Sequence, residues 1–118
     1  MSLHIELADH VDRNFGEHLS RPVEHKQDAL VVHLDNGVTL TARYAANDAY
    51  SLRWTYGDLE LGIDTAPLHR ELATFPNHLH DGNGQARPDP LTRPELAPAE
   101  NISLLIHALL ADPSLGLG

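Results

Sequence analysis

Apolar residues recur at helical spacing in the first part of the chain. The pattern predicts an N-terminal helix over Leu3–Leu19, because its apolar positions fall on one face. A strand from Leu3 to Leu7 is the alternative, since Asn14 and Gly16 are weak helix formers. The five residues of the apolar face are Leu7, Ala8, Val11, Phe15 and Leu19.

From residue 29 to residue 64, apolar and polar residues alternate with a period of two, which is typical of strands with one buried face. Asn36-Gly37 and Gly57-Asp58 interrupt the alternation and predict tight turns, because such residues tolerate positive φ. Residues 45–49 are expected to form a loop. The pattern therefore predicts a four-stranded antiparallel meander over residues 29–64.

A second helical pattern occupies Glu100–Ala111 and ends before Pro113. Four prolines precede it within residues 86–98 and predict an extended strap across the fold. We expect the apolar face of this helix to pack on the sheet, around Trp54. A stacking platform for a base is the alternative role of Trp54. The expected core comprises Leu52, Trp54, Leu61, Ile63, Ile102, Leu105, Ile106 and Leu109.

Together these patterns predict an α+β fold in a single domain, residues 1–118. The N-terminal helix lies within 1–21 and the meander covers 29–64. An irregular loop rich in histidine and proline, followed by the Pro-rich strap, covers 64–98. The C-terminal helix covers 99–112 and packs on the sheet.

The composition narrows the classes of function. The chain has no cysteine, which excludes disulfides, thiolate metal sites and cysteine nucleophiles. Its formal charge of −9 favours basic partners and works against unaided binding of nucleic acid. The first residues lack the basic and then apolar run of a signal peptide, and no apolar stretch approaches the roughly 18 residues of a membrane span. We therefore expect a cytoplasmic protein without a membrane partner.

Candidate chemistry gathers between Asp64 and Asp81. This stretch holds three of the nine histidines, His69, His78 and His80. The stretch contains two prolines, Pro67 and Pro76, which fix φ and lack a backbone N–H. We therefore interpret it as an extended, semi-rigid surface loop. On an extended segment, residues two apart point the same way, so the imidazoles of His78 and His80 can converge.

Three interpretations of these histidines stay open. With His69 as the third ligand they could bind zinc or nickel, and Asp64 or Asp81 could orient one of the rings. Without metal, one histidine could take a proton from an attacking hydroxyl while another gives one to the leaving group. Arg53 or Arg70 would then neutralise a phosphate, as cleavage of RNA requires. The structural alternative is that the rings only cap backbone groups of an irregular loop.

The order of motifs resembles the TumE family of toxin–antitoxin system toxins. A hairpin with Asn-Gly precedes a Tyr-Ser-x-x-Trp strand, a glycine turn and a strand that ends in Asp, and Ala-Pro-x-His and Phe-Pro-x-His-x-His follow. The family pattern is Asp-Asn-Ala-Pro-His-His, a spacer, then Phe-Pro-His-His-x-His. The resemblance covers about residues 30–110. This chain keeps Asp64, Ala66, Pro67, His69, Phe75, Pro76, His78 and His80, and it departs at Thr65, Leu68 and Asn77.

The resemblance implies a cytoplasmic toxin encoded beside a helix-turn-helix antitoxin. It implies growth inhibition by cleaving or blocking RNA through His69, His78 and His80, with Asp64 in support. An endoribonuclease-like activity that needs no metal is the enzymatic form of this hypothesis, and a homodimer is compatible with it. The alternative function is a non-catalytic module that binds metal or another protein through the same loop.

Overall fold

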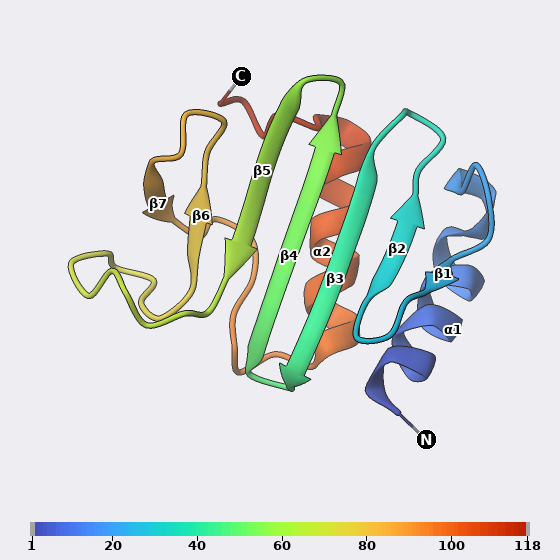
Figure 1. The fold of residues 1–118 in the computed structure, drawn as a ribbon, viewed down its shortest axis with the longest axis horizontal. Coiled ribbons are helices and arrows are strands. Elements are labelled where there is room, and N and C mark those ends of the chain that lie inside the picture. The colour runs from blue at the N-terminus through green and yellow to red at the C-terminus, as the bar shows by residue number, and fades with distance from the viewer. Residues whose placement is uncertain (1, 118) are drawn as a thin grey trace.

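The computed structural model describes residues 2–117 (Figure 1). Met1 and Gly118, the two ends of the predicted domain, lie outside the described residues. The two helices are α1 (Leu3–Phe15) and α2 (Pro98–Ala111), and a 3₁₀ turn, η1 (Gly16–His18), follows α1. The strands are β1 (Glu24–His25), β2 (Leu30–His33), β3 (Thr39–Ala46), β4 (Ala49–Tyr56), β5 (Leu59–Asp64), β6 (His78–His80) and β7 (Ala86–Pro88).

The strands form one antiparallel sheet in the order of the sequence, from β1 to β7. The α+β class, the two terminal helices and the antiparallel sheet are confirmed. The prediction of four strands is wrong, because the sheet of the described residues has seven. β1, β6 and β7 have only two or three residues each, which is too short for alternation to be detected.

Two segments expected to be irregular therefore belong to the sheet. His78–His80 is strand β6 rather than part of a surface loop, and Ala86–Pro88 of the expected strap is the edge strand β7. An edge strand tolerates a proline such as Pro88, because one side of its backbone has no strand to pair with. The expected loop at 45–49 is shorter than predicted, since β3 reaches Ala46 and β4 begins at Ala49.

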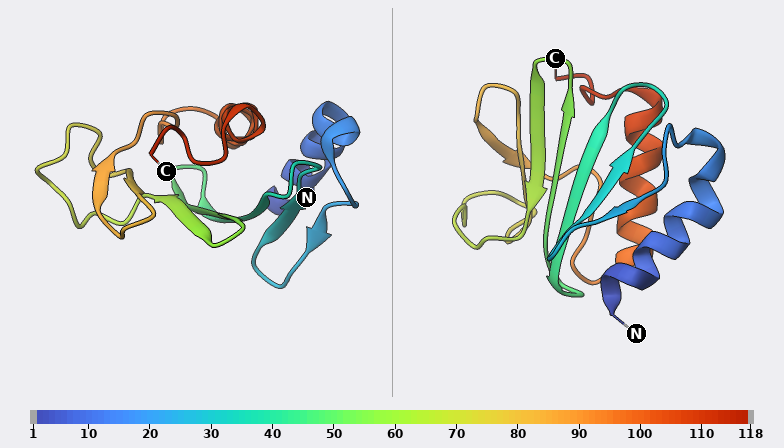
Figure 2. Two further views of the ribbon diagram at one scale, coloured as in Figure 1. Left: turned by 90° about the horizontal axis from the view of Figure 1, so that it is seen from above. Right: turned by 45° about the vertical axis from the view of Figure 1, so that its right-hand side comes forward.

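Both helices lie on the same side of the sheet and leave its other side without a helix (Figure 2). We call this other side the helix-free face. The predicted core is confirmed, since each of its members is buried between the sheet and the helices: Leu52, Trp54, Leu61, Ile63, Ile102, Leu105, Ile106 and Leu109. Trp54 donates its indole N–H to the Pro113 carbonyl at 2.9 Å, which rules out the stacking-platform role.

The N-terminal helix is confirmed, and the alternative strand over Leu3–Leu7 is wrong. The Ser2 hydroxyl caps it by accepting from the backbone N–H of Ile5 at 3.2 Å. The α-helix ends at Phe15, earlier than the expected Leu19, because the chain tightens into η1 from Gly16. Across residues 2–117, neither helix is long and apolar enough to cross a bilayer.

Candidate functional site

Strand register brings Asp64, His78 and His80 together. Asp64 is the last residue of β5 and lies opposite His78, while Gly62 lies opposite His80. Residues that face each other across two strands share one side of the sheet, and so do residues two apart. The intervening Leu79 and Ile63 point into the core, so the three polar side chains lie on the helix-free face.

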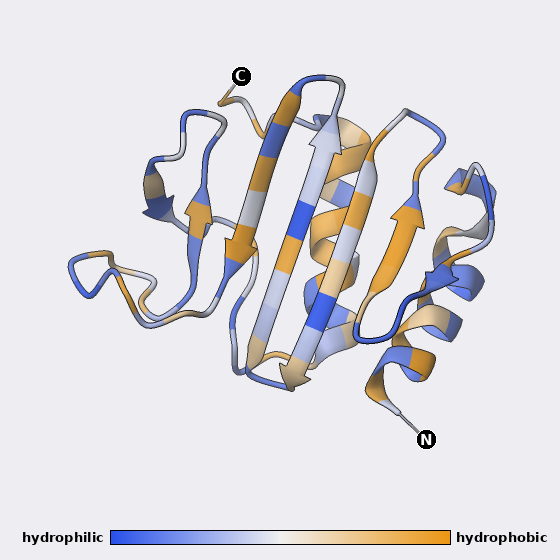
Figure 3. Ribbon diagram, viewed as in Figure 1, coloured by the Kyte–Doolittle hydropathy of each residue, from blue (hydrophilic) through white to orange (hydrophobic). Residues whose placement is uncertain are grey.

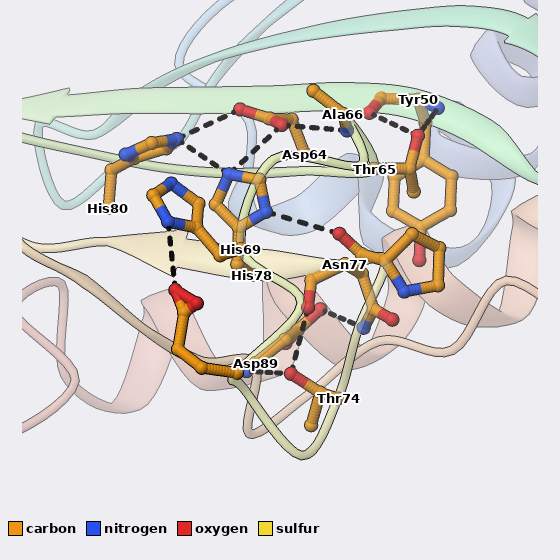
Figure 4. A network of polar contacts seen from close by, with 12 residues as sticks. Tyr50, Asp64, Thr65, Ala66, His69, Thr74, Asn77, His78, His80 and Asp89 are labelled. Carbon is orange, nitrogen blue, oxygen red and sulfur yellow. Dashed lines mark hydrogen bonds and ion pairs between the residues drawn. The ribbon is translucent and has the colours of Figure 1, made fainter.

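The polar atoms of these three residues nearly touch (Figure 4). The Nε2 atoms of His78 and His80 are 2.9 Å apart. The Asp64 carboxylate lies 3.2 Å from His78 Nε2 through Oδ1 and 3.1 Å from His80 Nε2 through Oδ2. We call this group the Asp64–His78–His80 triad.

Hydrogen bonding around His78 determines where its proton lies. Its Nδ1 is 3.2 Å from the Pro76 carbonyl, which can only accept, so Nδ1 carries the hydrogen. Nε2 of the neutral ring then presents a lone pair to the triad. The Nε2–H of His80 can donate to His78 Nε2 or to the Asp64 carboxylate. No hydrogen is then left for the contact between His78 Nε2 and Asp64 Oδ1, where two acceptors face each other. The triad therefore has the chemistry to hold a metal cation.

Burial gives the three side chains different access to solvent. The His78 side chain is 1% exposed, whereas those of Asp64 and His80 are 26% and 34% exposed. A substrate can reach His80 and Asp64 but not His78. His78 is consequently placed to orient its two neighbours rather than to meet a substrate.

His69 lies beside the triad, on the loop of residues 65–77 that joins β5 to β6 (Figures 1 and 4). Its ring meets that of His78 edge to face, with centroids 4.8 Å apart, and its centroid lies 6.3 Å from that of His80. Its Nδ1 turns to Glu71, at 3.4 Å from Oε1. The structure thus brings all three predicted histidines together, but Asp64 joins His78 and His80 as a potential ligand where His69 was expected.

Asp81 lies apart from the triad and organises the turn between β6 and β7. Its carboxylate accepts from the backbone N–H groups of Asn83 and Gln85 and from Arg87 Nε, at 2.9, 2.9 and 2.6 Å. The Arg87 guanidinium, helped by the two backbone donors, holds the pKa of Asp81 below its usual range. We expected Asp81 to orient a histidine ring, and the structure gives its carboxylate these other partners.

The two predicted phosphate-binding arginines lie in different places. Arg53 is on β4, and its side chain runs over Gly62, where an added Cβ would lie 3.5 Å from Arg53 Cγ. Arg53 therefore lies on the helix-free face. It is in register with Gly62 on β5, and Gly62 is in register with His80 on β6. Arg70 instead lies on the loop, with its guanidinium carbon 6.0 Å from the centre of the Phe75 ring.

Arg43 is a residue of this face that the sequence reasoning missed. It lies on β3 in register with Ser51, which faces Asp64, which faces His78. The signal was present in the alternation of residues 38–44, which sends Arg43 to the side opposite Ala42 and Tyr44. The sequence does not reveal that β6 pairs with β5. Without that pairing, His78 and His80 could not be assigned to the same side of the sheet as Arg43.

A buried polar network anchors the end of the histidine loop. Asn77 donates its side-chain N–H groups to Asp89 Oδ2 and to the Thr92 carbonyl, both at 2.8 Å. Thr74 donates to the Asn77 carbonyl at 2.8 Å, and the Tyr50 and Thr92 hydroxyls lie 2.8 Å apart. Burial raises the pKa of Tyr50 to about 12, so its phenol stays neutral. The network fixes the chain directly before His78.

Two hollows flank the triad on the helix-free face. The first, of about 400 Å³, is lined by residues that include Arg43, Ser51 and Asp64. The second, also of about 400 Å³, is lined by residues that include Arg53 and His80. Each hollow combines one arginine with one accessible member of the triad, and the second is also lined by Glu60 and Asp81.

Comparison with known families gives a match over nearly the whole chain. The model of the family described as toxin TumE matches residues 6–112. The chain belongs to the TumE family. The family resemblance inferred from the motifs is confirmed, and the triad consists of Asp64, His78 and His80, three of the residues on which that resemblance was based. Searches of curated proteins and of solved structures found no match. Membership supports a toxin role and, with it, an antitoxin partner.

Proposed function

We propose that the chain is a toxin that cleaves RNA at the Asp64–His78–His80 triad, with His69 as a second proton-transfer group. The observation that carries this proposal is the convergence of the three polar side chains at 2.9–3.2 Å on an accessible face. The antitoxin that neutralises it is, in this proposal, a helix-turn-helix protein encoded nearby, as the resemblance implies.

His80 is the proposed general base. Its Nε2 meets Asp64 and His78, so Nδ1 is the ring nitrogen left for a substrate. A carboxylate that accepts from one ring nitrogen fixes the tautomer in which the other carries a lone pair. Nδ1 would take the proton of a ribose 2′-hydroxyl while its oxygen bonds to the adjacent phosphorus.

His69 is the proposed general acid. As the bond from phosphorus to the 5′-oxygen breaks, His69 would protonate that oxygen, which yields a 2′,3′-cyclic phosphate and a free 5′-hydroxyl. The ring centroids of His69 and His80 are 6.3 Å apart, which supports the proposal that both rings act on one phosphate. Arg53, in the row that leads to His80, would neutralise the phosphate charge. No metal is required for this sequence of proton transfers.

Growth of bacteria that express the chain without its antitoxin tests the proposal. We expect inhibition by the wild-type chain and relief in His80→Ala, because removing a general base lowers the rate by about two to four orders of magnitude. His25→Ala is the matched control, since His25 is exposed on β1, at the other end of the sheet. Inhibition that persists in a folded His80→Ala protein removes the triad from the mechanism.

The purified protein should also yield RNA fragments with 2′,3′-cyclic phosphate ends in the presence of a chelator. Coexpression of a neighbouring helix-turn-helix protein should restore growth. Cleavage that stops when metal is removed would contradict the metal-independent mechanism. A wild-type chain that binds metal but leaves RNA intact would favour the second candidate function.

That second candidate is a metal-binding module. At ligand distances of about 2.1 Å, adjacent ligand atoms of an octahedral metal lie about 3.0 Å apart and those of a tetrahedral one about 3.4 Å. The two Nε2 atoms, 2.9 Å apart, lie close to the octahedral value, and one ligand atom from each triad residue lies within 4.8 Å of the others. Zinc and nickel suit imidazole ligands, and His78 already has the tautomer that leaves Nε2 free to bind.

Calorimetry with zinc and with nickel tests this candidate. We expect about one equivalent to bind to the wild-type chain and none to His78→Ala or Asp64→Asn. His69→Ala should retain binding, because His69 Nδ1 turns to Glu71 instead of the triad. Equal binding by Asp64→Asn and the wild-type chain would show that the metal occupies surface histidines elsewhere.

A further inference from the structure

The helix-free face carries two arginines in register with the triad. One row across the sheet reads Arg43, Ser51, Asp64 and His78, and the next reads Thr41, Arg53, Gly62 and His80. In each row the arginine lies two strands from a triad member, or about 10 Å between backbones. Both arginines thus lie on the central strands β3 and β4, next to the strands β5 and β6 that carry the triad.

Neither arginine is firmly held by an acidic partner. Arg43 Nε lies 3.7 Å from Asp28 and an Arg53 terminal nitrogen lies 3.7 Å from Glu60, and all four side chains are about half exposed or more. Ion pairs this long and this exposed contribute little, because water screens them. Each guanidinium can therefore exchange its carboxylate for a phosphate, which it can bind through two parallel hydrogen bonds.

Arg53 lies against Gly62 on the neighbouring strand. A Cβ added at Gly62 would lie 3.5 Å from Arg53 Cγ, an ordinary contact distance, so the Arg53 side chain follows the surface of β5. The row from β4 to β6 thus has only a glycine between Arg53 and His80. A phosphate held by Arg53 would lie beside the accessible ring of the triad.

Both sides of the sheet carry acidic residues, but the two arginines distinguish the helix-free face, where Arg43 has Asp28 nearby and Arg53 has Glu60. The chain has a net charge of −9, but α1 and η1 alone carry four acidic residues on the helix-bearing side, Glu6, Asp9, Asp12 and Glu17. A polyanion is repelled there. Figure 3 views the helix-free face and shows hydrophilic segments in the middle of β3 and β4. These strands carry Arg43 and Arg53.

We propose that Arg43 and Arg53 bind two phosphates of a single-stranded RNA that crosses the helix-free face past the triad, from the hollow at Arg43 to the hollow at Arg53. The inference rests on the proposed function, because it takes RNA as the ligand of the same site. It assigns Arg43 to substrate binding and places the scissile phosphate next to His80. Recognition through phosphates makes the binding dependent on salt and tolerant of sequence.

We call this path, with phosphates bound by Arg43 and Arg53, the phosphate track. Binding to a short fluorescent 2′-O-methyl RNA tests the track, because this probe has no free 2′-hydroxyl and is not cleaved by the proposed mechanism. We expect Arg43→Gln and Arg53→Gln each to weaken binding and to reduce the slope of log affinity against log salt by about 0.7. Arg43→Lys should retain the slope, because it keeps the charge. Arg13→Gln is the matched control, since Arg13 lies on the exposed surface of α1.

An affinity and a salt slope for Arg43→Gln equal to those of Arg13→Gln overturn the track, and so does a wild-type chain that does not bind the probe. If the wild-type chain binds with the expected dependence on Arg43 but neither inhibits growth nor cleaves RNA, the proposed function fails while the track stands. If Arg43→Gln cleaves RNA as fast as the wild-type chain and binds equally well, the track fails while the function stands.

Discussion

At the scale of single residues, the two nitrogens of the His80 ring have different tasks. Nε2 is taken up by Asp64 and His78, which leaves Nδ1 for a substrate. Because His78 is buried, it cannot exchange places with His80 although both rings belong to the same short strand. In the proposed mechanism, burial gives the two histidines of the His-x-His pair different roles: His78 orients and His80 reacts.

The positions where the chain departs from the TumE pattern differ in their structural weight. Leu68 is 74% exposed, so its side chain has almost no role in packing. Asn77 is buried, and it satisfies Asp89 and the Thr92 carbonyl. Restoring the family's histidine should therefore be easy at one position and costly at the other.

We predict that Leu68→His leaves the stability unchanged within about 0.5 kcal/mol, as is usual for exposed sites. Asn77→His should lower the free energy of unfolding by about 1–3 kcal/mol, because it leaves buried acceptors without a donor. Urea denaturation followed by circular dichroism measures both. Equal midpoints for the two variants would show that the network around Asn77 does not anchor the loop.

At the scale of elements, the hairpin of β6 and β7 is small and depends on its turn. Its three paired positions join His78 to Pro88, Leu79 to Arg87 and His80 to Ala86. Asp81 closes the turn through two backbone N–H groups and Arg87. Two backbone bonds, from Asp81 N–H to Gln85 and from Gly84 N–H to Asp81, close the same turn, so the Asp81 carboxylate adds to a turn that holds two histidines of the triad.

Acid should loosen this hairpin. The pKa of Asp81 is lowered in the folded protein by Arg87 and by backbone donors, so its ionised form stabilises the fold above the unfolded pKa of about 3.9. This contribution is lost as the pH falls through the lower, folded pKa. We predict that Asp81→Asn lowers the denaturation midpoint at neutral pH and that the difference from the wild-type protein shrinks below about pH 4.

Asp58→Asn is the control for this experiment, because Asp58 is an exposed carboxylate in another turn of the sheet. Denaturation midpoints of the wild-type protein and both variants, measured across the acid range, give the comparison. A gap between Asp81→Asn and the wild-type protein that stays constant with pH would exclude the ionised carboxylate as its cause.

The same element shows what the sequence could and could not predict. Strands β3, β4 and β5 have six to eight residues and alternate clearly, so they and their buried faces were predicted. β6 has three residues between prolines and glycines, and only its pairing with β5 makes it a strand. The His-x-His pair was found because its geometry is local. Asp64 was expected only as a support, and Arg43 was missed, because both depend on register.

At the scale of the whole molecule, one sheet separates two surfaces of different character. The helices and the core occupy one side, and the triad, Arg43 and Arg53 occupy the other. Trp54 lies at the centre of the buried side and reaches the chain after α2 through its bond to Pro113. A change at this position should therefore affect the whole fold rather than one surface.

Trp54→Ala should lower the free energy of unfolding by about 3–5 kcal/mol, because it leaves a large cavity and removes a hydrogen bond. Equilibrium denaturation in urea, followed by circular dichroism, measures the loss. Tyr56→Ala serves as the control, since Tyr56 lies on the same strand but is 45% exposed. An unchanged midpoint for Trp54→Ala would contradict the packing of the sheet on α2.

The placement of the loop of residues 65–77 has a consequence for how members of such a family can diverge. Asp64 ends β5 directly before the loop and His78 begins β6 directly after it, so contacts of the triad close the loop at its base. The triad residues thus belong to the strands, whereas His69, the proposed general acid, belongs to the loop. Changes within the loop that keep His69 can therefore leave intact the strand pair that holds the triad.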